Sequence, residues 1–287
     1  SGGTIALITG IFEKLINSIK SFNLTAAKLL FKGKFKEFSE YVNLNFLIAI
    51  FIGIVVSILS LAKLLEFLFL NHPIKIWAYF FGLIMASVYF VGKTIDKWNF
   101  SSFAMFILGT GVAVYISFLN PATGNSAFYY LFLCGVVAIC SMIIPGLSGS
   151  FVLILMGNYQ LVVIDAVNNL DMAILGPVLV GAVAGLIAFS HLLSYIYKKF
   201  KDQTIAILSG FILGSLSILW PWKHEIYRYD EAGNIMLKAS GEKIVQGYDR
   251  YIPQTFDSQV LYAVLIIIAG ILSIYLIEKF AEQKQAD

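Results

Sequence analysis

Long apolar runs alternate with short polar connections along most of the chain. Several of these runs approach or exceed the ~20 residues that a helix needs to cross a bilayer. The pattern predicts apolar spans at about Leu44–Leu70, Ile76–Val91, Phe103–Leu119, Tyr129–Met142 (interrupted at its end), Met172–Tyr197, Thr204–Trp220 and Gln259–Ile277. Hydrophobic residues make up 59% and charged residues 13% of the sequence, far from the average of a soluble domain. We therefore expect an all-α polytopic membrane protein whose residues 1–287 form a single transmembrane domain.

One apolar run is interrupted at its centre. Helix-forming residues from Tyr129 to Met142 lead into Pro145-Gly146, which breaks a helix. Ser148-Gly149-Ser150 then offers a capping hydroxyl, and the apolar run from Phe151 to Met156 restarts the helix. A broken helix at membrane depth leaves backbone N–H groups unpaired, which is tolerated only inside protein or beside a polar cavity. The pattern predicts a helix broken inside the membrane.

The same motif occurs at the start of the chain. Ser1-Gly2-Gly3-Thr4, an apolar run and Gly10 match Ser148-Gly149-Ser150, an apolar run and Gly157 at a constant offset of 147 positions. We expect a first half-helix from Ser1 to about Ile19. The helix that would pair with it, as Tyr129–Met142 pairs with the second half-helix, is expected to precede Ser1.

A second internal match covers the long spans. Phe46–Leu65 aligns with Ile174–Leu193 at an offset of 128, which places Gly53 on Gly181, and the same offset places Gly82 on Gly210. Three full spans separate the two copies, and an odd number turns the second copy upside down. We therefore predict inverted-topology repeats at residues 1–127 and 128–287. Each repeat would hold a re-entrant broken-helix hairpin followed by three transmembrane helices, the architecture of many secondary transporters.

The distribution of lysines predicts the orientation. Cytoplasmic loops are rich in Lys and Arg, and one topology places four groups of lysines in the cytoplasm if Tyr129–Asp171 enters and leaves from outside. These groups are Lys14, Lys20, Lys28, Lys32, Lys34 and Lys36; Lys93 and Lys97; Lys198, Lys199 and Lys201; and Lys279 and Lys284. The C-terminus is then cytoplasmic and the loop 223–257 is extracytoplasmic.

Two shorter segments have patterns of their own. Asn23–Tyr41 is basic and amphipathic, which is typical of a segment that lies along the membrane surface. In the outer loop, Ile226–Tyr229 and Ile235–Lys238 flank a polar turn and predict a small β-hairpin.

Two half-helix starts that enter from opposite faces would point their positive ends at one place. Each end carries roughly half an elementary charge together with free N–H donors, which suits a phosphate monoester. Close helix packing by small residues is the alternative explanation, but packing does not require the Pro145-Gly146 break. The candidate phosphate-binding residues are Ser1, Gly2, Gly3, Thr4, Pro145, Gly146, Ser148, Gly149 and Ser150.

Two kinds of ionisable residue are candidates for coupling. Glu13 on the first half-helix could carry a proton or a sodium ion, or it could lie at the cytoplasmic surface beside Lys14. Lys63 and His191 are equivalent under the offset of 128 and could be phosphate ligands or proton sensors. Snorkelling or an ion pair with Glu66 explains Lys63 at least as well.

The remaining polar candidates offer no chemistry of an enzyme. Asn158 and Tyr159 end the second half-helix and could hydrogen-bond a substrate or anchor the segment at the interface. Cys134 and Cys140 share one predicted helix at a spacing that gives neither a disulfide nor a metal pair. No hydrolase, metalloprotease or P-loop motif is present. We expect no catalytic residue, cofactor, metal or nucleic-acid partner.

The two motifs carry a family resemblance. Ser1–Glu13 and Ile144–Phe151 are similar to the two signature motifs of the bacterial polyprenyl-phosphate translocases (PopT), formerly a family of unknown function, and the similarity covers essentially the whole chain. The family's first motif usually begins with an acidic residue and Pro-Gly directly before this Ser, and those positions lie outside the sequence.

The resemblance implies a lipid transporter of the bacterial cytoplasmic membrane. It would carry undecaprenyl phosphate from the outer to the inner leaflet, coupled to an ion gradient, so that the carrier of cell-envelope precursors is recycled. Alternating access would come from rocking one repeat against the other around a fixed site. The alternatives are an ion-coupled transporter of small anions and a membrane lipid phosphatase. Tail-length preference and oligomeric state do not follow from the sequence.

Overall fold

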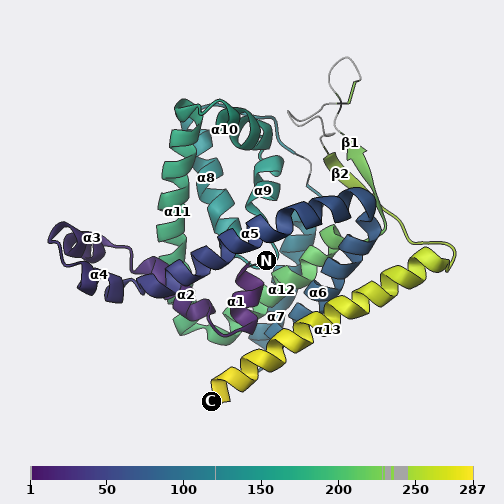
Figure 1. Cartoon of the computed structure of the whole chain (residues 1–287), viewed down its shortest axis with the longest axis horizontal. Coiled ribbons are helices and arrows are strands. Elements are labelled where there is room, and N and C mark those ends of the chain that lie inside the picture. Colours follow the sequence, from purple (N-terminus) through teal and green to yellow (C-terminus); the bar gives the residue numbers. More distant parts are fainter. Residues whose placement is uncertain (1, 120, 228, 230–233, 236–244, 287) are drawn as a thin grey trace.

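A computed structural model describes residues 2–119, 121–227, 229, 234–235 and 245–286. Within these ranges, six helices are long and apolar enough to cross a membrane (Figure 1). They are α5 (Leu44–Asn71), α6 (Pro73–Lys93), α7 (Phe100–Ser117), α11 (Met172–Lys199), α12 (Lys201–Leu219) and α13 (Ser258–Ala286). The prediction of a polytopic helical membrane protein is confirmed.

Shorter helices precede and separate the long ones. They are α1 (Gly2–Ile8), α2 (Phe12–Lys20), α3 (Leu24–Phe31), α4 (Phe35–Tyr41), α8 (Phe128–Ile143), α9 (Gly149–Leu155), the π-helix η1 (Gln160–Asp165) and α10 (Ala166–Asn168). The prediction of one continuous half-helix from Ser1 to Ile19 is wrong. Gly10 has a φ of 71°, in the left-handed region, and ends the first helix there. The basic stretch is likewise two helices, α3 and α4, separated at Gly33, which has a φ of 70°.

The outer loop contains a two-stranded antiparallel sheet. Strand β1 (Lys223–Tyr227) pairs with β2 (Val245–Arg250), so that Lys223 lies opposite Arg250. The pairing of β1 with β2 was not predicted, whereas Tyr229 forms an isolated antiparallel bridge with Ile235, as the predicted hairpin requires. Residues 236–238 lie outside the described residues. The alternation of apolar and polar residues did not indicate β2 as a partner of β1. In the fold, β2 lies beside α6, where the Tyr248 ring contacts the Trp77 ring.

The long helices pack through glycines. A Cβ at Gly82 of α6 would overlap the Ile267 carbonyl of α13, and one at Gly210 of α12 would overlap the Phe106 carbonyl of α7. Helices in a membrane associate by close packing and not by leaving water, so small residues at the crossing allow the backbones to approach. Each of these pairs joins a helix from the first half of the chain to one from the second half.

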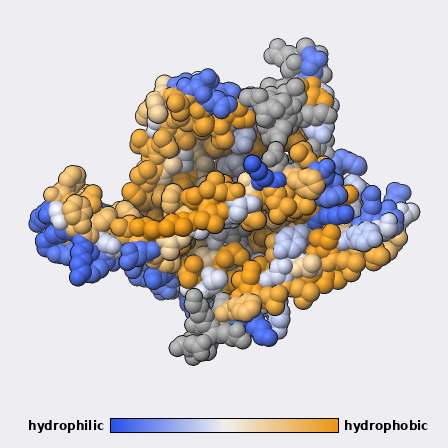
Figure 2. Space-filling model, viewed as in Figure 1, coloured by the Kyte–Doolittle hydropathy of each residue, from blue (hydrophilic) through white to orange (hydrophobic). Residues whose placement is uncertain are grey.

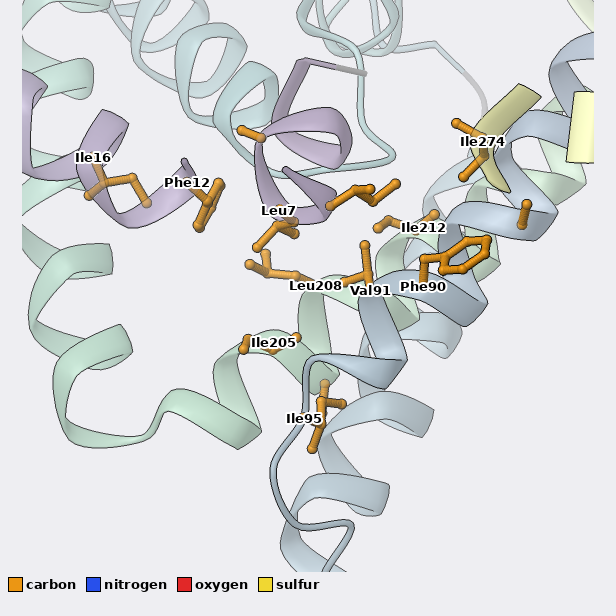
Figure 3. Packing of buried hydrophobic residues seen from close by; sticks show 14 of the residues in the cluster. Leu7, Phe12, Ile16, Phe90, Val91, Ile95, Ile205, Leu208, Ile212 and Ile274 are labelled. Atoms are coloured by element: carbon orange, nitrogen blue, oxygen red, sulfur yellow. The ribbon is translucent and has the colours of Figure 1, made fainter. Parts of the chain in front are cut away.

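The short N-terminal helices lie in the middle of the protein. Leu7 of α1 and Phe12 of α2 belong to one buried cluster with Val91 of α6 and with Leu208 and Ile212 of α12 (Figure 3). Figure 1 places the N-terminus at the centre of the molecule, while β1 and β2 lie away from α3, α4 and the C-terminus. The chain therefore begins at the place where its two halves meet.

Element boundaries recur with the two predicted spacings. Helices α5 and α11 have 28 residues each, and both their first and last residues are 128 positions apart. The linker residues that follow are alike, His72 with φ −139° and ψ 51° and Phe200 with φ −137° and ψ 59°. Helices α1 and α9 have seven residues each and start 147 positions apart. Gly10 (φ 71°) and Gly157 (φ 73°) follow them. The matching sequences therefore have the same local structure.

Candidate functional site

The break predicted at Pro145-Gly146 separates α8 from α9. Helix α8 ends at Ile143, Ile144 is extended with φ −73° and ψ 120°, and Pro145 is buried. Gly146 has a φ of 87°, and a Cβ there would lie 2.6 Å from the Phe211 carbonyl of α12. Only glycine combines this conformation with so close an approach to another backbone. The turn is thus fixed by its own residues and by α12.

After the break, α9 folds back along α8. A Cβ at Gly149, the first residue of α9, would lie 2.8 Å from the Ala138 carbonyl of α8. At the other end of α9, the Tyr130 hydroxyl donates a 2.8 Å hydrogen bond to the Met156 carbonyl. The end of α9 therefore lies beside the beginning of α8.

Asn158 closes this hairpin. Its side chain is completely buried, and its amide nitrogen donates to the Asn125 carbonyl at 2.8 Å. Its amide oxygen accepts from the Asn125 N–H, also at 2.8 Å. Buried polar groups are normally paired in this way. These contacts give Asn158 a structural role in closing the hairpin, whereas the sequence had suggested a substrate ligand or an interface anchor. No feature of the sequence indicated the roles of Asn125 and Tyr130.

The position of α8 against α11 gives the depth of the break. The two helices run in parallel, with the Phe132 carbonyl at Gly181 and the Cys140 thiol 3.9 Å from the Gly185 carbonyl. Gly185 lies at the middle of the 28-residue α11. At a rise of ~1.5 Å per residue, the middle is about 20 Å from either end. Pro145 comes nine residues after Val136, which faces Gly185, and Gly146 packs against Phe211, near the middle of the 19-residue α12.

The first motif lies against the break. A Cβ at Gly3 of α1 would lie 3.0 Å from the Ile143 carbonyl and 3.3 Å from a ring carbon of Pro145. Gly2 is exposed and has open space beside it, whereas Ser1 lies outside the described residues. The structure thus brings the described part of the first Ser-Gly motif to the start of the second. We call this meeting of α1 with the α8–α9 break the junction.

The junction carries three hydroxyl side chains. Ser148 and Ser150 are exposed, and their hydroxyl oxygens are 2.8 Å apart. Ser148 was predicted to cap α9, but its side chain makes no capping hydrogen bond, because it is bonded to Ser150 instead. The first-turn N–H groups of α9 therefore have no capping side chain. Thr4 is only 1% exposed, and its Oγ1 has no hydrogen-bond partner among the described residues.

The other candidate residues lie elsewhere. Glu13 is near the start of α2, beside Asn17, Ser194, Tyr197 and Lys198. The Ser194 hydroxyl donates to the Asn17 amide oxygen at 3.0 Å and joins α11 to α2. Glu13 is therefore at the lysine-rich end of α11 and not at the break.

Lys63 and His191 lie on the long helices α5 and α11. Lys63 projects from the exposed α5. His191 is half-buried in α11, with its Nδ1 2.8 Å from the Ile187 carbonyl of the preceding turn. Tyr159 is half-buried just before η1. Within the described residues, no group of three His, Cys, Asp or Glu side chains could hold a metal ion.

Six apolar helices of membrane-spanning length, together with a broken helix whose second half has no capping side chain, are typical of a multi-pass membrane transporter. The chain belongs to the undecaprenyl phosphate translocase-like family, whose sequence profile matches residues 1–236. It is 36% identical over 289 residues to a protein of Vibrio cholerae serotype O1 named polyprenyl-phosphate transporter, covering 99% of this chain and 91% of that protein. A Staphylococcus aureus protein of the same name is 32% identical over 195 residues, 62% of this chain and 69% of that protein. No solved structure matches the chain.

Proposed function

We propose that this protein carries undecaprenyl phosphate across the bacterial cytoplasmic membrane, from the outer to the inner leaflet. The observation that carries the proposal is the junction, where the start of α1 meets the α8–α9 break near mid-depth. Family membership supports a polyprenyl phosphate as the substrate. The relatives in two bacteria are named for the transport of this class of lipid.

The junction has the chemistry that a phosphate monoester requires. A charged group at the bilayer centre costs at least ~2.5–3.5 kcal/mol on insertion scales. Free N–H groups at the start of α9, together with the hydroxyls of Thr4, Ser148 and Ser150, would offset that cost by donating to the phosphate oxygens. The remaining motif residues, Ser1 to Gly3, Pro145, Gly146 and Gly149, would shape the backbone around it. The polyprenyl tail would stay in the lipid.

We also propose that the two halves are inverted repeats, at residues 1–127 and 128–287. The equal lengths and boundaries of α5 and α11, and of α1 and α9, support this arrangement. The return of α9 to the start of α8 supports a re-entrant hairpin that enters and leaves on the same side.

The polar contacts at one end of the helices support the proposed orientation. Lys93 at the end of α6 pairs with Glu278 of α13 at 3.2 Å. Lys201 at the start of α12 pairs with Asp96 of the α6–α7 loop at 3.0 Å. These lysine-bearing ends therefore lie together, which fits a cytoplasmic face that includes the C-terminus. The loop 223–257 would then be extracytoplasmic.

The packing suggests which part moves during transport. Helices α6, α7, α12 and α13 interlock across the two halves through glycine–backbone contacts, which favours a moving unit smaller than one repeat. We therefore propose that α8, α9 and α11 pivot together about the contact of Gly146 with α12, opening the junction to each leaflet in turn. Glu13, at the lysine-rich end of α11, is the candidate for a coupling proton or sodium ion, with Lys63 and His191 as further candidates.

Reconstitution into liposomes tests the function. Labelled undecaprenyl phosphate is placed in one leaflet, and its appearance in the other is followed with and without a proton or sodium gradient. Ser148→Leu removes an exposed hydroxyl without a packing clash, so we expect it to abolish transport while membrane insertion is kept. Gly176→Leu, at an open position of α11, is the matched control.

Three outcomes would contradict the proposal. Transport by Ser148→Leu at the control rate would assign the motif to packing alone. Release of inorganic phosphate from the labelled lipid would indicate a phosphatase. Uptake of phosphate without its lipid would favour a small-anion transporter, which needs a site sealed from the bilayer.

A further inference from the structure

The β1–β2 sheet holds two cationic side chains against the end of α12. Lys223 of β1 lies opposite Arg250 of β2, so both side chains project from the same face of the sheet. The Arg250 Nε donates a 2.5 Å hydrogen bond to the Ser217 carbonyl. The Lys223 Nζ donates to the Ile218 carbonyl at 2.6 Å. Because these carbonyls belong to the last turn of α12, the two cations lie together at one helix end.

Aromatic rings place this end of the protein at the depth of lipid headgroups. The Lys223 ammonium lies 3.4 Å from the centre of the Trp77 ring, near the start of α6. Trp220 donates from its Nε1 to the Tyr251 carbonyl at 2.9 Å, which joins the end of α12 to the residue after β2. Tryptophan and tyrosine gather where a membrane meets water, and in Figure 2 the hydrophobic surface of α5 gives way to hydrophilic residues at the turn into α6. The cations are therefore within reach of phosphate groups in the adjacent leaflet.

Arg250 has hydrogen-bond donors that the protein does not use. Its guanidinium is half-buried and lies 4.9 Å from the centre of the Phe118 ring at the end of α7. A guanidinium has five N–H donors, and the hydrogen bond to Ser217 uses only the one on Nε. Among the described residues no carboxylate forms an ion pair with Arg250, and burial lowers its pKa, as expected for a cation without a paired anion.

Capping of α12 explains only part of this arrangement. Lysine and arginine near a helix C-terminus commonly bond its last carbonyls, which accounts for the Nζ of Lys223 and the Nε of Arg250. Capping does not account for the terminal nitrogens of the guanidinium. It also does not account for two like charges directly opposite each other on paired strands, an arrangement that is destabilising by itself. A bound anion accounts for both.

We propose that Arg250 and Lys223 form a docking site for the phosphate headgroup of the lipid substrate before it enters the junction. A phosphate monoester carries up to about two negative charges and can bind the guanidinium fork through two oxygens. At the junction, Gly146 lies against the Phe211 carbonyl of α12. Ser217 follows six residues later in the same helix, about 9 Å further along the axis for a rise of ~1.5 Å per residue. The inference rests on the proposed function for the identity of the lipid, and on the proposed orientation for the leaflet, which is the outer one.

The concentration dependence of transport tests the role of Arg250. With labelled undecaprenyl phosphate supplied in the leaflet on the side of the sheet, Arg250→Gln should raise the lipid concentration for half-maximal rate roughly tenfold or more, the loss expected for one charge-assisted hydrogen bond. The maximal rate should be kept, whereas a role in capping α12 alone would lower the maximal rate and the melting temperature. Lys75→Gln removes an exposed cation near the start of α6 and is the matched control. An equal effect of Lys75→Gln, or none of Arg250→Gln, would show that Arg250 does not dock the lipid.

Chemical protection of Arg250 identifies the ligand without relying on transport. In phosphatidylcholine nanodiscs, undecaprenyl phosphate should slow the modification of Arg250 by phenylglyoxal, followed by mass spectrometry of the peptide. Undecaprenol, which has the same tail without the phosphate, should give no protection. Equal protection by phosphatidylglycerol would make the site a general anchor for anionic lipids and overturn the proposal, as would labelling that no lipid slows. Protection of Arg250 in a protein that moves no lipid would contradict the proposed function and leave the docking site intact.

Discussion

The buried hydroxyl of Thr4 gives the sharpest test of the junction. Thr4→Val replaces Oγ1 with a methyl group of similar size at a position only 1% exposed. This oxygen has no partner among the described residues, and a buried hydroxyl without a partner costs about 1–3 kcal/mol. Removing this hydroxyl should therefore raise the free energy of unfolding by about 1 kcal/mol or more. In a chain of roughly this length, each kcal/mol corresponds to a rise of ~2–4 °C in the melting temperature.

Substrate binding should change in the opposite direction. If Oγ1 donates a hydrogen bond to the phosphate, its loss removes a charge-assisted bond worth about 1.5–3 kcal/mol. At ~1.4 kcal/mol per factor of ten, the affinity for undecaprenyl phosphate should fall roughly 10- to 100-fold. A variant that is more stable yet binds more weakly is the signature of a polar group kept for its ligand.

Ser209→Ala is the matched control for Thr4→Val. Ser209 on α12 is the other buried hydroxyl without a partner in the described part of the chain. Its removal should stabilise the protein similarly without changing affinity. Thermal unfolding of purified protein and lipid binding in detergent or nanodiscs measure the two quantities. Unchanged affinity in Thr4→Val, or an equal loss in Ser209→Ala, would refute the assignment of Thr4 to the phosphate.

Three further predictions concern the hairpin, the helix pairs and the charged end. Asn158→Ala leaves the Asn125 N–H and carbonyl unpaired, so thermal unfolding should show that the free energy of unfolding falls by about 2–4 kcal/mol. Transport should fall in proportion, and a variant of full stability would contradict the closing role of Asn158. Gly210→Leu would push α12 off the α7 backbone, so the yield of folded protein on size exclusion should drop sharply; a normal elution profile would refute the close crossing. Glu278→Gln breaks an ion pair with a largely exposed Lys93, so stability should change by less than ~1 kcal/mol, and a larger change in melting temperature would argue against this estimate.

The interlocked helix pairs bear on how any member of this architecture could move. Gly82 and Gly210 each bring the backbones of two helices from different halves into contact. Separating such a pair in lipid would remove the contacts between the two backbones, and glycine has no side chain that could replace them with contacts to lipid. The polar contacts of α11 with α2, such as that between Ser194 and Asn17, are fewer and can be exchanged more easily. This difference supports the proposal that α11 moves relative to the other helices.

The sequence alone determined the features that depend on local chemistry. The long apolar runs could only be helices in a membrane, because no other segment satisfies its backbone there. Pro145 and Gly146 had to break a helix wherever they lay. The offsets of 128 and 147 predicted repeated elements, and the pairs α5 with α11 and α1 with α9 have equal lengths. The break at Gly10 was missed because a lone glycine in an apolar run also fits a continuous helix.

Only the tertiary structure decided which of these residues meet. It showed that Ser148 bonds Ser150 and does not cap α9, that Asn158 closes the hairpin, and that the buried Thr4 hydroxyl has no partner among the described residues. Residues far apart in the chain are brought to one site only by the packing of helices. In lipid, the periodicity of a sequence does not indicate which helix packs against which. The pairing was set by where the backbones approach each other, which the sequence records only as scattered glycines.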